Sequence, residues 1–195
     1  SEEVTTSEKF IYFTSDGITA DGGSGNDLLI GSANGDTLKG LEGNDQIHGG
    51  DDGDNIEGGP GNDTLYGGAG NDRISGGSSD SQTPGGDDVI YGGDGDDTLS
   101  AAGNSTIYGG AGNDWLLADH WGRDSAVLSV YGGDGNDELG FSNVGLKILD
   151  AGDGDDDVSL HTGTSYEPIS ISGGAGYDTL TISSWYQHWS KVSND

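Results

Sequence analysis

Residues 22–75 read GGSGNDLLI, GSANGDTLK, GLEGNDQIH, GGDDGDNIE, GGPGNDTLY and GGAGNDRIS, six consecutive copies of one nine-residue pattern. The pattern is G-G-x-G-x-D-x-U-x, in which U is an aliphatic residue. Further clear copies begin at Gly92, Gly109, Gly132, Ala151 and Gly173. A repeat of fixed length predicts a solenoid, in which each unit packs mainly against its neighbours.

Weaker segments join these copies, and they keep one feature of the repeat. Counting residues 76–91, 101–108, 118–131, 141–150 and 160–172 as units gives 16 units between Gly22 and Thr181. The eighth position is Leu, Ile or Val in all of them: Leu29, Ile47, Leu65, Ile90, Ile107, Val130, Leu149 and Ile171 in the odd-numbered units, and Leu38, Ile56, Ile74, Leu99, Leu116, Leu139, Val158 and Leu180 in the even-numbered units. The apolar position therefore persists where the glycine-rich positions do not.

This pattern predicts an all-β fold, a parallel β-roll built as a two-sheet right-handed solenoid. Positions seven to nine form a short strand whose middle side chain points inward, because side chains alternate between the faces of a strand. Positions one to six form a turn in which glycine permits positive φ or close packing. Two units make one coil, so the odd units build one sheet and the even units the other. Residues 22–181 form about eight coils, and residues 1–21 and 182–195 are expected to be the N-terminal and C-terminal caps.

The composition indicates that the chain needs a cationic partner. Forty of its 195 residues are glycine, and 35 acidic residues against six basic ones give a formal net charge of −29. High net charge with few large apolar residues is typical of disorder unless something neutralises the charge. The same charge argues against binding to nucleic acid. No apolar run is long enough to span a membrane, and because the sequence opens at Ser1 we expect it to be part of a longer protein.

The sixth position of the repeat supplies the candidate metal ligands, since Ca²⁺ prefers carboxylate and carbonyl oxygens. The even units carry Asp36, Asp54, Asp72, Asp97, Asp114, Asp137, Asp156 and Asp178, and the odd units carry Asp27, Asp45, Asp63 and Asp88, followed by Ser105, Leu128, Lys147 and Ile169. We expect each ion to lie between two turns on the same edge of the roll. The turns of the even units lie on one edge of the roll (the even edge) and those of the odd units on the other (the odd edge). Seven ions on the even edge and three on the odd edge give an upper count of about 10, so about 7–10 calcium ions are expected. The alternative is a solvated acidic surface, but stacked carboxylates about 4.8 Å apart would repel one another strongly.

Units two and four depart from the pattern. Asn34 and Asp52 stand where glycine is expected, and both residue types tolerate the left-handed region of the backbone. We expect working but slightly altered turns there.

The nonapeptides between Gly22 and Thr181 resemble the RTX (repeats-in-toxin, haemolysin-type) calcium-binding repeat family. This resemblance implies a β-roll with calcium ions stacked in its turns. It also implies a bacterial protein that leaves the cell by type I secretion and acts extracellularly. Because cytosolic calcium is low, the chain would stay disordered inside the cell and fold after export.

The second half of the odd edge is the candidate for ligand binding. Its variable loops, residues 118–128, 141–147 and 160–169, gather His120, Trp121, Arg123, Phe141, His161 and Tyr166. Position nine of the odd units places Tyr66, Tyr91, Tyr108 and Tyr131 in an outward row. These side chains could bind a polysaccharide or a cell surface, as loops on a rigid scaffold often do. The structural alternative is that the loop aromatics pack over the edge and that the tyrosines stabilise the sheet as a cross-strand row.

The leading hypothesis is therefore a calcium-folded structural module of a secreted protein. The second is a calcium-dependent module that binds carbohydrate or a cell surface. An ice-binding role needs a regular outward array of Thr or Asn, and the third position does not provide one: Ser24, Ala33, Glu42, Asp51, Pro60 and Ala69. We expect no enzymatic activity, because neither H-E-x-x-H nor G-x-S-x-G occurs.

Overall fold

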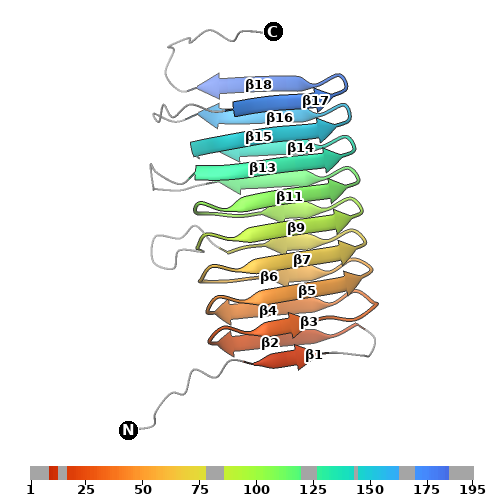
Figure 1. The fold of residues 1–195 in the computed structure, drawn as a ribbon, viewed down its shortest axis with the longest axis vertical. Coiled ribbons are helices and arrows are strands. Elements are labelled where there is room, and N and C mark those ends of the chain that lie inside the picture. The colour runs from red at the N-terminus through yellow and green to blue at the C-terminus, as the bar shows by residue number, and fades with distance from the viewer. Residues whose placement is uncertain are drawn as a thin grey trace.

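The computed structural model describes residues 9–12, 17–77, 86–119, 127–142, 145–162 and 170–184. These residues form two parallel sheets of nine strands each, stacked in chain order along the long axis of the molecule (Figure 1). One sheet contains β1 (Phe10–Tyr12), β3 (Leu28–Ile30), β5 (Gln46–Asp51), β7 (Thr64–Ala69), β9 (Val89–Asp94), β11 (Thr106–Ala111), β13 (Val127–Asp134), β15 (Gly145–Asp153) and β17 (Ser170–Ala175). The other contains β2 (Thr19–Ser24), β4 (Thr37–Glu42), β6 (Asn55–Glu57), β8 (Arg73–Ser75), β10 (Thr98–Ser100), β12 (Trp115–Asp119), β14 (Glu138–Ser142), β16 (Asp157–Thr162) and β18 (Thr179–Ser184). Among the described residues no helix is long and apolar enough to cross a membrane.

The register of the strands confirms the parallel β-roll. Position eight of each odd unit pairs with position eight of the next odd unit, as Ile47 does with Leu65, and the even units pair in the same way. Alternate units therefore belong to alternate sheets, as the repeat predicts. We call the turns before the odd strands the odd edge and the turns before the even strands the even edge.

The core is the double row of position-eight side chains between the two sheets. Fourteen of the 16 are at most 3% exposed, from Leu29 to Val158. The last two, Ile171 and Leu180, are 37% and 41% exposed. The core is thus one residue deep on each sheet, which is why no other apolar position needs to be constant in the repeat.

Residues before the first nonapeptide add one further strand to each sheet. β1 pairs with β3 so that Ile11 lies beside Leu29, and the start of β2 pairs with β4 so that Ala20 lies beside Leu38. Ala20 is buried and Ile11 is partly buried against the core. These parts of the segment expected as the N-terminal cap therefore continue the roll. At the other end β18 runs to Ser184, and residues 185–195 lie outside the described part of the chain.

From β12 onward the even strands are longer than β6, β8 and β10, and this corrects the prediction that Phe141 begins a surface loop. β12, β14 and β16 extend past position nine, and Ala118, Phe141 and Leu160 pair side by side. All three side chains are buried, at no more than 3% exposure. Without the glycine turn the backbone stays extended, so the next inward-facing residue adds a second apolar row to the core.

Glycines at positions two and four of the repeat shape the turns. Position two and position four have positive φ, as at Gly68 (124°) and Gly70 (127°). Position two of unit three holds Leu41 at φ 76°, and Asp52 at position four of unit four has φ 61° as expected. Asn34, at position four of unit two, is not among the residues with positive φ.

Truncation of one core side chain gives the first prediction. Leu99 is fully buried between Ile74 and Leu116, whereas its neighbour Thr98 is half-buried on the other face of β10. Leu99→Ala should destabilise the roll by about 2–5 kcal/mol, because it removes buried methyl groups and leaves a cavity. Thermal unfolding under identical solution conditions should show a clearly lower midpoint for Leu99→Ala and a much smaller change for Thr98→Ala. Equal shifts for both variants would contradict the predicted core.

Candidate metal centre

The turns bury the aspartates of position six, which is unusual for a charged side chain. Eleven of the 12 predicted metal ligands are at most 3% exposed: Asp27, Asp36, Asp45, Asp54, Asp63, Asp72, Asp88, Asp97, Asp114, Asp137 and Asp156. The twelfth, Asp178, lies in the last coil and is exposed. The aspartates stack one per coil, so each edge carries a column of buried carboxyl groups.

One carboxyl oxygen of each aspartate is used to hold the coils together. The Oδ1 atom of Asp45 accepts the backbone N–H of Asp27, at an N···O distance of 2.8 Å. The same bond links Asp36 to Asp54 (2.7 Å) on the even edge and recurs along both columns. Each carboxyl group therefore takes up a backbone N–H of the coil before it, which explains why the side chain turns inward.

The other carboxyl oxygen has no hydrogen-bond partner. The Oδ2 atoms of ten aspartates are buried and unpaired: Asp27, Asp45, Asp54, Asp63, Asp72, Asp88, Asp97, Asp114, Asp137 and Asp156. An unpaired buried polar atom is costly, and a charged one more so. A repeated arrangement of such atoms indicates that a cation belongs beside them.

Eight of the ten open oxygens face a backbone carbonyl of the next coil across the glycine of position one. A Cβ atom placed on Gly22 would lie 2.5 Å from Oδ2 of Asp27 and 2.7 Å from the carbonyl oxygen of Gly40. Three of these glycines are on the odd edge and five on the even edge, and Gly31 lies in the same way between Oδ2 of Asp36 and the carbonyl oxygen of Gly49. Position one is therefore glycine because any side chain would enter a space lined by oxygen atoms.

This donor set fits calcium. Ca²⁺ takes six to eight oxygen ligands and accepts carboxylate and carbonyl oxygens together. No group of three or more His, Cys, Asp or Glu side chains that could hold a metal occurs within the described ranges, and the oxygen atoms that face the aspartates are backbone carbonyls. The residues that would hold the ions are the position-six aspartates together with the facing carbonyls, such as Asp45 with Gly58 or Asp54 with Gly67.

Burial also raises the pKa of several carboxyl groups in the columns, because the charged form loses its hydration. The pKa rises to about 7 for Asp54, Asp63, Asp88, Asp97 and Asp137, and to about 6 for Asp114. For Asp54 the neighbouring carboxylates of its column raise the pKa further, whereas the backbone N–H of Asp36 lowers it. Without a metal, the columns therefore resist full ionisation near neutral pH.

Two positions on the even edge differ from the rest. In the altered turn of unit two, Oδ2 of Asp36 accepts the backbone N–H of Ser32 at 2.6 Å, so this aspartate is not left open. In unit 14 the position-one residue is Ala151, whose side chain is fully buried. A methyl group thus stands where the other turns have a glycine, and the Asp156 turn has less room for an ion.

The odd column ends at Ser105. Its Oγ atom accepts the N–H of Asp88 at 2.9 Å, as an aspartate would, but its hydroxyl proton is donated to the carbonyl of Ala102. Leu128 follows in the next coil and is fully buried. Leu128 pairs with Leu146, and Lys147 falls at an irregularity of the pairing, so the expectation that Lys147 takes the sixth position is wrong. Ile169 lies outside the described residues.

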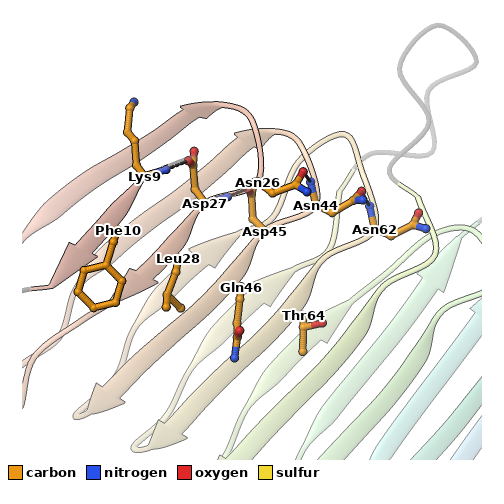
Figure 2. Close-up of a pocket in the computed structure, with 10 residues that line it drawn as sticks. All are labelled: Lys9, Phe10, Asn26, Asp27, Leu28, Asn44, Asp45, Gln46, Asn62 and Thr64. Atoms are coloured by element: carbon orange, nitrogen blue, oxygen red, sulfur yellow. Dashed lines mark hydrogen bonds between the residues drawn. The ribbon is translucent and has the colours of Figure 1, made fainter. Parts of the chain in front are cut away.

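A second column of polar side chains, not anticipated from the sequence, runs outside the first. The Oδ1 atom of Asn26 accepts the N–H of Asn44 (2.9 Å), and Asn44 does the same for Asn62 (2.8 Å). Figure 2 shows this column along the odd edge beside Asp27 and Asp45, at the rim of a shallow groove. Position five thus bonds to the following coil and position six to the preceding one. The sequence does contain a signal for this column, since position five is Asn or Asp in most units.

The outward aromatic row forms a stack on the odd sheet. The rings of His48, Tyr66, Tyr91, Tyr108 and Tyr131 follow one another at centroid distances of 4.5 to 4.9 Å with interplanar angles of at most 8°. Ring faces therefore contact each other, and only their edges are available for a ligand. This favours the interpretation of a cross-strand row that stabilises the sheet.

The rest of the proposed ligand-binding edge is only partly described. Phe141 is buried in the core, and His161 is exposed on β16. His120, Trp121, Arg123 and Tyr166 lie outside the described residues. Binding of a polysaccharide or a cell surface by this edge stays a prediction.

Comparison with known proteins agrees with the geometry of the turns. The family model described as RTX calcium-binding nonapeptide repeat (4 copies) matches residues 21–56, 48–82, 85–102, 100–119 and 129–140, which is more than half of the chain. Neither the search of curated proteins nor the search of solved structures gave a significant match. Because the matched residues include most of the turns whose aspartates form the two buried columns, the chain belongs to the RTX calcium-binding nonapeptide repeat family.

Proposed function

We propose that this roll is a folding module controlled by calcium: the chain is mostly disordered without Ca²⁺ and folds into the roll when Ca²⁺ binds. The observation that carries the proposal is the set of ten buried, unpaired Oδ2 atoms in the two aspartate columns. The folded state creates these sites and the unfolded chain does not have them. Metal that binds only the folded state adds its binding free energy to folding.

The energetics of the metal-free roll support this order of events. Each unsatisfied buried polar group costs about 1–3 kcal/mol, and a charged one costs more. Ten such atoms in one small domain cost about 10–30 kcal/mol together, which is comparable to or larger than the margin of about 5–15 kcal/mol by which domains are usually stable. The core is thin, with one buried apolar residue per strand in most of the first half of the roll, and offers little to offset this cost.

The proposed setting is outside a bacterial cell. RTX repeats are typical of secreted bacterial proteins, and extracellular calcium greatly exceeds cytosolic calcium. We propose that the chain crosses the cell envelope unfolded, by type I secretion, and folds on arrival. We assign no catalytic role to this region, since its buried carboxylates are distributed over repeated turns rather than gathered in one cleft.

Calcium removal is the direct test. Far-UV circular dichroism of the purified chain should show a disordered spectrum in excess chelator and a β-sheet spectrum after Ca²⁺ is added back. The same titration with Mg²⁺ should fail to fold the chain, because Mg²⁺ is smaller and gives up its water ligands reluctantly. A spectrum that chelator leaves unchanged would rule out the proposal.

Two adjacent aspartates provide a matched pair of variants. Asp97 is buried at position six with an unpaired Oδ2, whereas Asp96 is exposed at position five and accepts the N–H of Asn113. Both changes to Asn remove one charge and keep an oxygen that can accept a backbone N–H. Asp97→Asn places an amide donor where the cation belongs, so it should lower the number of bound ions and raise the calcium midpoint of folding several-fold. Asp96→Asn should behave nearly as the wild type, as measured by calorimetric titration and circular dichroism; equal effects would mean that the columns are not the sites.

The raised pKa values predict how acid affects the metal-free chain. An unfolded Asp titrates near 3.9, whereas several folded ones titrate near 7. These groups destabilise the metal-free roll increasingly as the pH rises from about 4 to 7, and fully above that range. In calcium-free buffer, acidification from pH 8 to about 4 should therefore increase the β-sheet signal. In calcium the sign reverses, because protons compete for the carboxylates; a metal-free spectrum independent of pH would contradict the pKa shifts.

A further inference from the structure

Lys9 directly precedes β1, at the place that a position-six aspartate takes before β3 and β5. Its backbone N–H donates to Oδ1 of Asp27 at 2.7 Å, and its carbonyl accepts the N–H of Leu28 at 2.8 Å. Both bonds repeat 18 residues later, where Asp27 donates to Asp45 and accepts from Gln46. Lys9 therefore extends the aspartate column by one coil, with a cation in place of a carboxylate.

The side chain of Lys9 reaches the carbonyl that corresponds to a metal-facing oxygen in the next coils. Its Nζ atom donates to the carbonyl oxygen of Gly22, and a Cβ atom on Gly23 would lie 2.7 Å from Nζ. One coil further on, the equivalent carbonyl is that of Gly40, which faces Oδ2 of Asp27. Figure 2 shows Lys9 and Asp27 side by side at the end of the odd edge.

We infer that the ammonium group of Lys9 is a tethered cation that takes the place of a calcium ion at the N-terminal end of the odd column. This inference rests on the proposed calcium function of the columns. A single positive charge suits this end, because only the turn that contains Asp27 contributes a carboxylate there. An ammonium group donates up to three hydrogen bonds, so it can bind carbonyl oxygens that a metal would otherwise bind.

The even edge begins differently, which shows that the lysine is not a general requirement of the fold. Ile18 occupies the corresponding place there: its N–H donates to Oδ1 of Asp36 at 2.8 Å, and its carbonyl accepts from Thr37. It has no cation to offer. Oδ2 of Asp36 accepts the N–H of Ser32, whereas Oδ2 of Asp27 has no hydrogen-bond partner. The odd column thus begins beside a cationic side chain, and the even column does not.

The test compares the wild type with Lys9→Asp, Lys9→Met and Lys39→Met. Lys39 is the matched control, because it is an exposed lysine that pairs with Glu57 on the outer face of the even sheet. Bound calcium is counted by native mass spectrometry, and hydrogen exchange is followed at the amide of Leu28. Lys9→Asp should bind one ion more than the wild type, since it places a carboxylate directly before β1, where the next odd strands are preceded by an aspartate. Lys9→Met should bind no additional ion and should lose at least tenfold protection at Leu28 relative to Lys39→Met.

The outcomes separate this inference from the proposed function. If Lys9→Asp binds as many ions as the wild type, or if Lys9→Met keeps the protection of the control, Lys9 is not a substitute for calcium although the columns still bind it. If the wild type binds no calcium, the proposed function fails and the role of Lys9 fails with it.

Discussion

The fold depends on a carboxylate that is buried with only half of its hydrogen bonds made. In each intact turn, Oδ1 of the aspartate closes a bond to the coil before it, and this bond fixes the spacing of the coils. The same geometry points Oδ2 at a carbonyl of the coil after it, over a glycine that leaves the space open. The chain therefore cannot build its own ladder without also building the oxygen-lined sites. The same aspartate side chain therefore holds neighbouring coils together and creates the site that needs a metal ion.

The turns of the odd edge are occupied either by metal-binding aspartates or by apolar side chains. On the odd edge the column of Asp27, Asp45, Asp63 and Asp88 gives way to Ser105 and then to Leu128, all of them buried. Ser105 keeps the ladder bond and satisfies itself by donating to Ala102. Leu128 has no side-chain oxygen to accept a backbone N–H of the preceding coil, and it packs in the core. Ala118, Phe141 and Leu160 on the facing strands also belong to the core. An edge filled in this way needs no ion, so the two halves of the molecule should depend on calcium to different degrees.

The sequence was sufficient to predict the parts of the fold that local rules determine. A strand three residues long with an apolar centre can bury only that centre, so Leu29 and the position-eight residues up to Val158 could be assigned to the core without a structure. The turn aspartates followed from their spacing for the same reason. The irregular segments could not be predicted, because their pairing is set by neighbours 18 or more residues away. Phe141 reads as a loop residue until Ala118 and Leu160 are placed on either side of it, and Lys9 has no repeat motif around it to reveal its register.

The distribution of charge along the roll bears on where order begins. From Gly22 to Asp88 both edges carry aspartates, and the units there are almost all nine residues long, so neighbouring turns have matching shapes. Under the proposed function, an ion bound between two such turns would fix both and prepare the next site, so that binding along a column would be cooperative in a linear array of repeats. Beyond Ser105 only the even column continues, and its Asp156 turn is narrowed by the methyl group of Ala151. The exposed Ile171 and Leu180 lie in the last coil. If calcium drives folding as proposed, order should therefore start in the first half, where both columns lie in the same coils, and extend toward the C-terminal coils, where the second apolar row also contributes.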